Sequence, residues 1–207
     1  MVTFLGNEGN NNLIKVDPQP EPADFDNKVR LPGSVFLARV ARPTRRQFKK
    51  HDFWKAGLSD LKAAYRNICA YTSVWIPNNC SVDHFLPKSS RPDLAYEWSN
   101  FRLAHDRINS IKGDSTDVLD PFYIQTGWFT LDIATLWVNP DPSLQTKVKM
   151  PVQDTIDILR LNDDQWVQMR FEVLSSYLNR ELTLSFLQRL YPFIATEILR
   201  QGVQPRV

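Results

Sequence analysis

The sequence predicts an α+β fold, with a small mixed centre and helical segments before and after it. Apolar residues recur at helical spacing before position 68 and again after position 153. Between these regions, short strand-like runs alternate with turn residues. The composition is also that of an ordinary globular domain, with 43% hydrophobic and 23% charged residues. This composition excludes disordered, collagen-like and coiled-coil classes, which all need a skewed residue usage.

The N-terminal residues 1–34 are expected to be extended. They contain an Asn/Gly-rich run over 6–12 and four prolines up to position 32, which disfavour a long helix. Pro43-Thr44 is a typical start for a short basic helix that ends near Lys50. A longer helix is predicted over 58–68, where apolar residues recur every three or four positions.

The centre and the C-terminal third follow from the same patterns. Residues 69–113 predict short strands, turns and a short helix ending at Gly113. The aromatic and β-branched stretch 122–138 predicts a two-stranded hairpin, stopped by Asn139-Pro140. Helices are then predicted over 153–160, from the cap at 162–164 to 179, and from Thr183 to just before Gly202 with a break at Pro192.

The net charge of +2 hides an uneven distribution along the chain. Residues 28–66, here called the basic segment, contain eleven basic and two acidic residues and sum to +9. Residues 1–27 and 114–207 each sum to −4, and residues 67–113 sum to +1. A basic segment is the usual electrostatic footprint of phosphate-backbone contact, although a solvated helix face gives the same pattern.

The expected environment is the cytoplasm. No apolar run is long enough to span a membrane, and the N-terminus lacks the charged and apolar regions of a secretory signal. Two cysteines, Cys69 and Cys80, cannot form a disulfide framework, so a reducing compartment is the simpler assumption.

The chemically informative stretch lies in the centre of the chain. Ser81-Val82-Asp83-His84-Phe85-Leu86-Pro87-Lys88 is followed by Trp98-Ser99-Asn100 and by Ile108-Asn109-Ser110-Ile111-Lys112-Gly113. One imidazole, one carboxylate and two carboxamides suit metal-assisted phosphodiester hydrolysis. A hard cation such as Mg²⁺ prefers oxygen ligands, and a histidine deprotonates water near neutral pH.

These residues resemble the HNH (ββα-metal, His-Me finger) endonucleases. The family pattern is Asp-His-hydrophobic-x-Pro, then Asn, then Asn or His followed three residues later by Lys. The forms Val-Asp-His-Phe-Leu-Pro-Lys-Ser and Glu-Trp-Ser-Asn-Phe-Arg-Leu are similar to HNH effector nucleases of bacterial anti-phage systems, such as the HNH subunit of Septu. The resemblance covers residues 69–113 and implies a ββα-metal core.

The resemblance implies a role for each matching residue. His84 is the implied general base, and Asn100 is the implied residue that orients it by a hydrogen bond. Asp83 and Asn109 are the implied ligands of Mg²⁺ or Mn²⁺. The implied phosphate contacts are Lys112 on the finger helix and, more weakly, Lys88 and Arg102. From the basic segment, Arg45, Arg46, Lys49 and Lys50 are further candidates for nucleic-acid contact.

A departure from the family concerns zinc. Many relatives hold a structural zinc with two Cys-x-x-Cys pairs, which here read Cys69-x-x-Thr72 and His105-x-x-Ile108. Structural zinc normally needs four closed ligands, so no zinc site is expected. Packing of Tyr71 and Ile108 is the expected replacement.

The resulting expectation is a metal-dependent endonuclease that hydrolyses DNA. The expected organisation is an extended segment 1–34, an HNH core with a basic helical lead-in at 35–138, and a helical extension at 139–207. The resemblance implies an effector of a prokaryotic defence system, with an ATPase or sensor subunit as partner. Two alternatives stay open: a stand-alone restriction or homing-type nuclease, and a non-catalytic nucleic-acid-binding assembly subunit. Neither a helix-turn-helix nor a zinc finger pattern is present to read bases.

Overall fold

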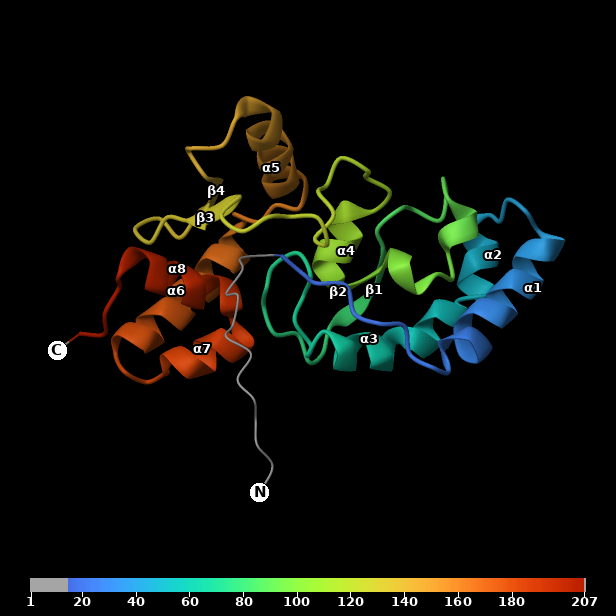
Figure 1. Ribbon diagram of the computed structural model, residues 1–207, viewed down its shortest axis with the longest axis horizontal. Helices are drawn as coiled ribbons and strands as arrows, with labels where there is room; N and C mark the ends of the chain where they lie inside the picture. The colour runs from blue at the N-terminus through green and yellow to red at the C-terminus, as the bar shows by residue number, and fades with distance from the viewer. Residues whose placement is uncertain (1–14, 207) are drawn as a thin grey trace, which may run out of the picture.

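The structure is a computed structural model that describes residues 15–206. Two small antiparallel sheets lie between helices that gather at the two ends of the long axis (Figure 1). The predicted α+β class is therefore confirmed. The Asn/Gly-rich run 6–12 lies outside the described residues. No helix between positions 15 and 206 is both long and apolar enough to cross a bilayer.

The N-terminal helices begin earlier than the sequence predicts. A wide helical turn over Asp26–Arg30 leads directly into α1, Leu31–Arg39. The expectation of extended chain is therefore wrong from Asp26 onward, and the boundary placed after position 34 falls inside α1. Pro32 does not prevent this helix because it stands at the start of the α-helical part, directly after the wide turn.

Two further helices complete this end of the molecule. Helix α2, Arg45–Lys50, begins with a full capping box between Thr44 and Gln47, as the sequence predicts. A 3₁₀ turn over Phe53–Gly57 leads into α3, Leu58–Ala64. Helix α3 ends before position 68 because Arg66 and Asn67 adopt left-handed backbone conformations, with φ of 51° and 58°.

Tyr96 fixes these helices against the centre of the molecule. A Cβ on Gly33 of α1 would lie 2.2 Å from the Tyr96 ring, so only glycine allows this approach. The Tyr96 hydroxyl donates a hydrogen bond to the carbonyl of His51, the residue that ends α2, at 2.7 Å. One aromatic side chain therefore contacts both α1 and the end of α2.

The central hairpin carries the sequence motif. Strand β1, Cys80–His84, pairs antiparallel with β2, Phe101–His105, and His84 lies opposite Phe101. Helix α4, Asp106–Lys112, follows β2 directly and packs on both strands. It ends at Gly113, whose φ of 51° favours glycine. The predicted short strand and the helix ending at Gly113 are both confirmed.

The second hairpin is shorter than the stretch that predicts it. Strand β3, Phe129–Leu131, pairs with β4, Val138–Pro140, in antiparallel register. The hairpin is confirmed, but residues 122–128 form turns and Asn139-Pro140 belongs to β4 instead of stopping it. Pro140 is tolerated because each strand of this two-stranded sheet is an edge strand.

The C-terminal third is helical, as predicted. Helix α5, Thr146–Ile158, begins earlier than expected and contains Pro151. It is followed by α6, Asp164–Leu178, α7, Leu184–Leu190, and α8, Pro192–Gln201. Pro192 separates the last two helices and Gly202 ends α8 in a left-handed conformation, both at the predicted positions.

Candidate functional site

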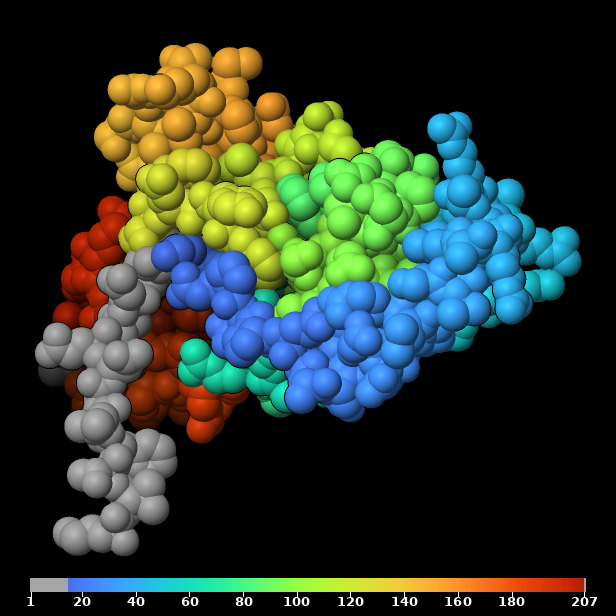
Figure 2. Space-filling view, turned by 45° about the vertical axis from the view of Figure 1, so that its right-hand side comes forward, coloured from blue at the N-terminus to red at the C-terminus, as the bar shows by residue number. Residues whose placement is uncertain are grey.

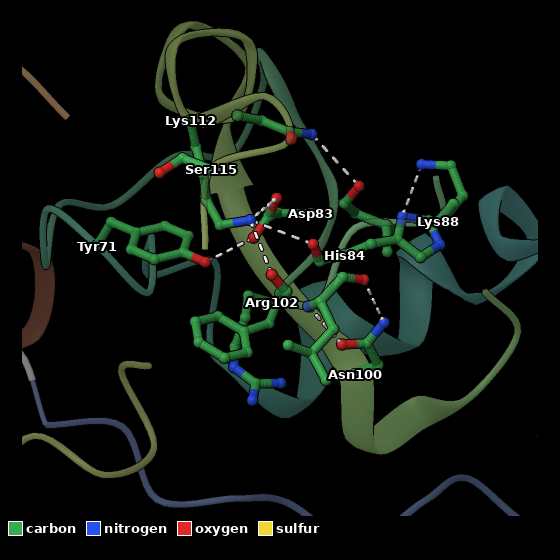
Figure 3. Close-up of polar contacts among 12 residues, drawn as sticks. Tyr71, Asp83, His84, Lys88, Asn100, Arg102, Lys112 and Ser115 are labelled. Carbon is green, nitrogen blue, oxygen red and sulfur yellow. Dashed lines mark hydrogen bonds and ion pairs between the residues drawn. The ribbon is translucent and has the colours of Figure 1, made fainter. Parts of the chain in front are cut away.

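Asp83 and His84 are consecutive residues of β1, so their side chains point to opposite faces of the hairpin. Both are almost fully buried, with relative exposures of 2% and 5%. A buried carboxylate and a buried imidazole each need specific partners. The partners differ completely between the two faces (Figure 3).

The imidazole of His84 is held from both nitrogens. Its Nε2–H donates to the carbonyl of Ala95 at 2.8 Å, which leaves Nδ1 as the basic nitrogen. Nδ1 accepts from the ammonium of Lys88 at 3.1 Å. The rings of Trp54 and Phe101 pack edge-on against the imidazole. Burial, and secondly the charge of Lys88, hold the pKa of His84 well below its ordinary value of 6.5, so the ring is neutral at pH 7.

Lys88 is the side chain that covers Nδ1. Its Nζ lies 4.8 Å from the centre of the Trp54 ring, in a cation–π contact. Burial lowers the pKa of this ammonium, and the negative charge of Asp83 opposes the shift. Lys88 is predicted to contact phosphate, and in the structure its ammonium bonds Nδ1 of His84.

Asn100 holds the loop that follows β1, and it does not bond the imidazole. Its Oδ1 accepts from the N–H of Leu86 at 2.8 Å, and its Nδ2 donates to the carbonyls of Leu86 and Leu94 at 3.0 and 3.2 Å. The expectation of a hydrogen bond from Asn100 to His84 is therefore wrong. Since Leu94 precedes Ala95, Asn100 instead positions the backbone that bonds Nε2.

The other face of β1 holds a closed charge pair. Lys112 Nζ donates to Asp83 Oδ1 at 3.1 Å, and the side chain of Lys112 has no exposed surface. Tyr71 donates its hydroxyl to Asp83 Oδ2 at 2.5 Å. Burial, followed by the charge of Asp83, raises the pKa of Tyr71 well above its ordinary value, so this hydroxyl stays a donor. The two oxygens of Asp83 are therefore both engaged.

Lys112 and Arg102 are structural in this arrangement, which corrects their assignment as phosphate contacts. The Lys112 ammonium is buried and also donates to the carbonyls of His84 and Phe85. The Arg102 guanidinium forms a two-pronged ion pair with Asp120 and stacks 3.4 Å from the centre of the Phe122 ring. Its side chain is 3% exposed. Neither cation has surface to offer to a ligand.

Asn109 lies on α4, one turn before Lys112. Its Nδ2 donates to the hydroxyl of Ser81 at 2.9 Å and to the carbonyl of Val82 at 3.3 Å. These bonds tie α4 to β1 and leave the carboxamide oxygen as the free ligand atom. The residue thus keeps an oxygen of the type that Mg²⁺ prefers.

In the conformations that the structure shows, the Asp83 and Asn109 side chains do not form a cation site. Mg²⁺ needs anionic or carbonyl oxygens with free lone pairs, and the Asp83 carboxylate is occupied by Tyr71 and by the positive charge of Lys112. No cluster of three or more Cys, His, Asp or Glu side chains suited to a metal occurs among residues 15–206.

The residues at the two positions compared with cysteine pairs, Cys69 and His105, contact each other. The N–H of His105 donates to Cys69 Sγ at 3.4 Å, and His105 Nδ1 caps α4 by accepting from Arg107 N–H. Tyr71 and Ile108 are buried in the apolar core. His105 is therefore a helix cap in this structure.

An open cleft of about 760 Å³ lies between α2 and α4. Trp54 and Lys88, which both contact His84, form part of its wall. The residues that line it are Pro43, Arg45, Phe48, Lys49, Asp52, Trp54, Lys55, Lys88, Ser89, Asp106, Asn109, Ser110, Gly113 and Asp114. The cleft therefore joins the basic segment to the sequence motif, and Asn109 faces it from α4.

The candidate basic residues divide into two groups. Arg45 and Lys49 line the cleft, whereas Arg46 and Lys50 are exposed on α2 but do not line it. Lys28, Arg30 and Lys55 of the basic segment are neutralised by neighbouring carboxylates. Within residues 15–206, the other exposed bases of α1 and α2 and of the turn between them form no ion pair: Arg39, Arg42, Arg45, Arg46, Lys49 and Lys50. Figure 2 shows this region in blue, beside the green central residues.

Two contributors were missed by the sequence analysis. Trp54 is not among the residues that the sequence singles out, but its ring contacts both His84 and Lys88. Tyr71 was expected only to pack, but its hydroxyl bonds Asp83. Trp54 lies outside the stretch 69–113, and Tyr71 lies inside it but is not one of its polar pattern residues, so only the folded structure shows both contacts.

Comparison with known proteins adds no family to this description. No protein-family model matches the chain, and no curated protein matches its sequence.

Proposed function

We propose that this protein is an HNH-type endonuclease that hydrolyses phosphodiester bonds in DNA. The observation that supports it best is the arrangement of His84: a neutral imidazole whose Nδ1 lies under Lys88, beside a cleft lined by unpaired bases of α2. A neutral imidazole has a lone pair that can accept a proton, and an anionic phosphate that draws Lys88 away would remove the positive charge that lowers its basicity.

His84 is the proposed general base. The Ala95 carbonyl fixes the proton on Nε2, so the lone pair of Nδ1 is the one available to accept a proton. In the reaction, Nδ1 takes a proton from a water molecule while the water oxygen forms a bond to phosphorus. The bond from phosphorus to the leaving oxygen then breaks, and that oxygen leaves with the electron pair and later gains a proton from solvent.

Lys88 is proposed to bind the scissile phosphate. Because its ammonium now occupies Nδ1, it must move to the phosphate before Nδ1 can accept a proton from water. The same movement brings a positive charge to the phosphate oxygens, where negative charge accumulates in the transition state. Arg45 and Lys49 line the same cleft and are proposed to hold the flanking phosphates.

The proposal includes a requirement for Mg²⁺ or Mn²⁺, as the family resemblance implies. It also includes the DNA-cleaving effector role in a prokaryotic anti-phage system, acting in the cytoplasm with an ATPase or sensor subunit. The support for these parts is the motif from Val82 to Ser89 and from Glu97 to Leu103 in the sequence. A genomic neighbour that encodes an ATPase or sensor would support the effector role over a stand-alone restriction or homing-type nuclease.

Cleavage of supercoiled plasmid DNA tests the activity. The wild-type protein is expected to nick or cut the plasmid with Mg²⁺ or Mn²⁺. His84→Ala is expected to lose about 10²- to 10⁴-fold of the rate, which is the usual contribution of a general base. His105→Asn is a matched control, since asparagine also caps helices and His105 lies at the start of α4. Equal rates for His84→Ala and wild type would disprove the assignment of His84 as the base.

A binding-only function is the second candidate. It is favoured by the occupied state of both functional groups, since Lys88 covers Nδ1 and Lys112 covers Asp83. In that case the cleft binds DNA without cutting it. Salt-dependent DNA binding with no cleavage in Mg²⁺ or Mn²⁺ would support this candidate over the nuclease.

A further inference from the structure

We propose that the Lys112 ammonium and a divalent cation exclude each other at Asp83, so that a metal ion enters only when Lys112 leaves. This inference rests on the proposed function, which supplies the metal requirement. It assigns Lys112 as an internal cation that occupies the metal position in the metal-free protein.

The oxygen atoms around Lys112 are the basis for this proposal. Nζ has three oxygen partners: Asp83 Oδ1 at 3.1 Å, the His84 carbonyl at 3.2 Å and the Phe85 carbonyl at 3.1 Å (Figure 3). One carboxylate and two carbonyl oxygens are also ligands of the kind that Mg²⁺ and Mn²⁺ prefer. An ammonium has three donors, so it satisfies these three acceptors without a metal.

Electrostatics makes the two occupants mutually exclusive. Asp83 contributes a single negative charge, and Tyr71 already takes its second oxygen. A divalent ion on Oδ1 would lie within a few ångströms of the ammonium in a site from which water is excluded. Repulsion between like charges is strong at that separation because burial reduces screening. One carboxylate therefore holds one of the two cations.

The cleft beside α4 can accommodate the Lys112 side chain when it is displaced from Asp83. It is the last residue of α4, and both Asn109, one turn earlier, and Gly113, the next residue, line the cleft. A displaced side chain of this length can extend from the end of α4 toward the cleft. Metal binding at Asp83 would then add a positive charge to the surface that is proposed to bind phosphate.

Metal affinity measured without any nuclease assay tests the exclusion. Mn²⁺ binding is followed by electron paramagnetic resonance for the wild type, Lys112→Met, Asp83→Asn and Lys62→Met. Lys62→Met is the matched control, because Lys62 is a partly buried lysine that bonds only the Pro77 carbonyl. Lys112→Met is expected to bind Mn²⁺ about tenfold to a hundredfold more tightly than wild type, since no charged hydrogen bond has to be broken. Asp83→Asn is expected to lose the site.

Chemical labelling of the wild-type protein gives a second readout that does not depend on a variant folding. Reductive methylation, read by mass spectrometry, is expected to spare Lys112 in the metal-free protein and to modify it at saturating Mn²⁺. The exposed Lys49 is the internal control and should react in both states.

Each outcome decides the proposal. Equal Mn²⁺ affinity in wild type and Lys112→Met, or a Lys112 that stays protected while Mn²⁺ is bound, would overturn it. Absence of Mn²⁺ binding in every variant would overturn it as well. The proposed nuclease function is judged separately, by plasmid cleavage with metal and with a chelator, so the two can fail independently.

Discussion

The two faces of strand β1 differ in how completely their polar side chains are paired. On one face, Asp83 is closed off by Tyr71 and Lys112, and no charge is left without a partner. On the other face, His84 is buried, but its basic nitrogen has only the ammonium of Lys88 as partner, and the cleft lies beyond. The first face therefore resembles a structural ion pair, and the second a site that is ready to exchange one partner for another.

This difference shows that adjacent motif residues can have separate structural roles. A buried ion pair stabilises a fold only when both partners are present, because removal of one leaves the other charge buried without a partner. A half-buried lysine over an aromatic ring is more easily released. The following predictions test this contrast, from the largest expected effect to the smallest.

The largest effect is expected from Asp83→Ala. This change leaves the Lys112 ammonium buried without a counter-charge and removes the acceptor of the Tyr71 hydroxyl, which is expected to cost about 3–5 kcal/mol of unfolding free energy. Asp114→Ala, at the exposed rim of the cleft, is the matched control and should stay within about 0.5 kcal/mol of wild type. Urea unfolding measures both. Equal losses would show that the buried ion pair of Asp83 contributes no more to stability than an exposed carboxylate does.

Asn100→Ala is expected to cost about 2 kcal/mol, because two buried carbonyls and one N–H of the loop lose their partner. The change also loosens the backbone before Ala95, so the cleavage rate should fall more than substrate binding does. Urea unfolding measures the loss of stability, and steady-state kinetics measure the changes in kcat and KM. If stability falls while kcat is unchanged, Asn100 supports the fold without positioning His84.

The stability of the protein should fall on acidification because of His84. Its folded pKa lies below the unfolded value, so the unfolded chain binds the extra proton first as the pH drops below about 6.5. Between the unfolded and the folded pKa, the loss approaches about 1.4 kcal/mol per pH unit. Unfolding in urea at pH 7.5 and 5.5 measures it. His84→Gln should lose less stability between these two pH values than the wild type does.

The smallest effect concerns DNA binding by α2. Arg45→Glu together with Lys49→Glu should reduce the slope of log affinity against log salt by about 2, since about 0.9 counterions are released per phosphate contact. Arg46→Glu with Lys50→Glu changes the same charge on the same helix but outside the cleft, and should act less. Fluorescence anisotropy at several salt concentrations compares the pairs. Identical slopes for the two double variants would show that these residues attract DNA non-specifically and that the cleft makes no phosphate contacts of its own.

Much of the fold was predictable because local signals decide it. Thr44 caps α2, Gly113 ends α4 and Pro192 separates α7 from α8 at the positions that the sequence predicts. The helix from Asp26 through α1 was missed because Pro32 was taken as a helix breaker. Its place in the first turn, and the contact of Gly33 with Tyr96, depend on tertiary packing.

The sequence names several residues that the structure brings together, but it does not predict their contacts. Lys88 and Asn109 of the motif line one cleft with Arg45 and Lys49 of the basic segment, and Lys88 contacts His84. The motif could not reveal that Lys112 points inward, because helix spacing gives the face of a side chain and not the partner that it meets. The partner of Asn100 was mistaken for a similar reason, since backbone acceptors leave no mark in a sequence.

Tyr96 and Ala95 are consecutive residues, and this gives the hairpin loop a mechanical role. The Tyr96 hydroxyl donates a hydrogen bond to the carbonyl at the end of α2, and the carbonyl of Ala95 sets the orientation of the His84 ring. The Tyr96 hydrogen bond, its side chain and one peptide link therefore connect the end of α2 to the carbonyl that orients the imidazole. A displacement of α2 would pull on Tyr96 and, through the adjacent peptide, on the carbonyl partner of the His84 ring.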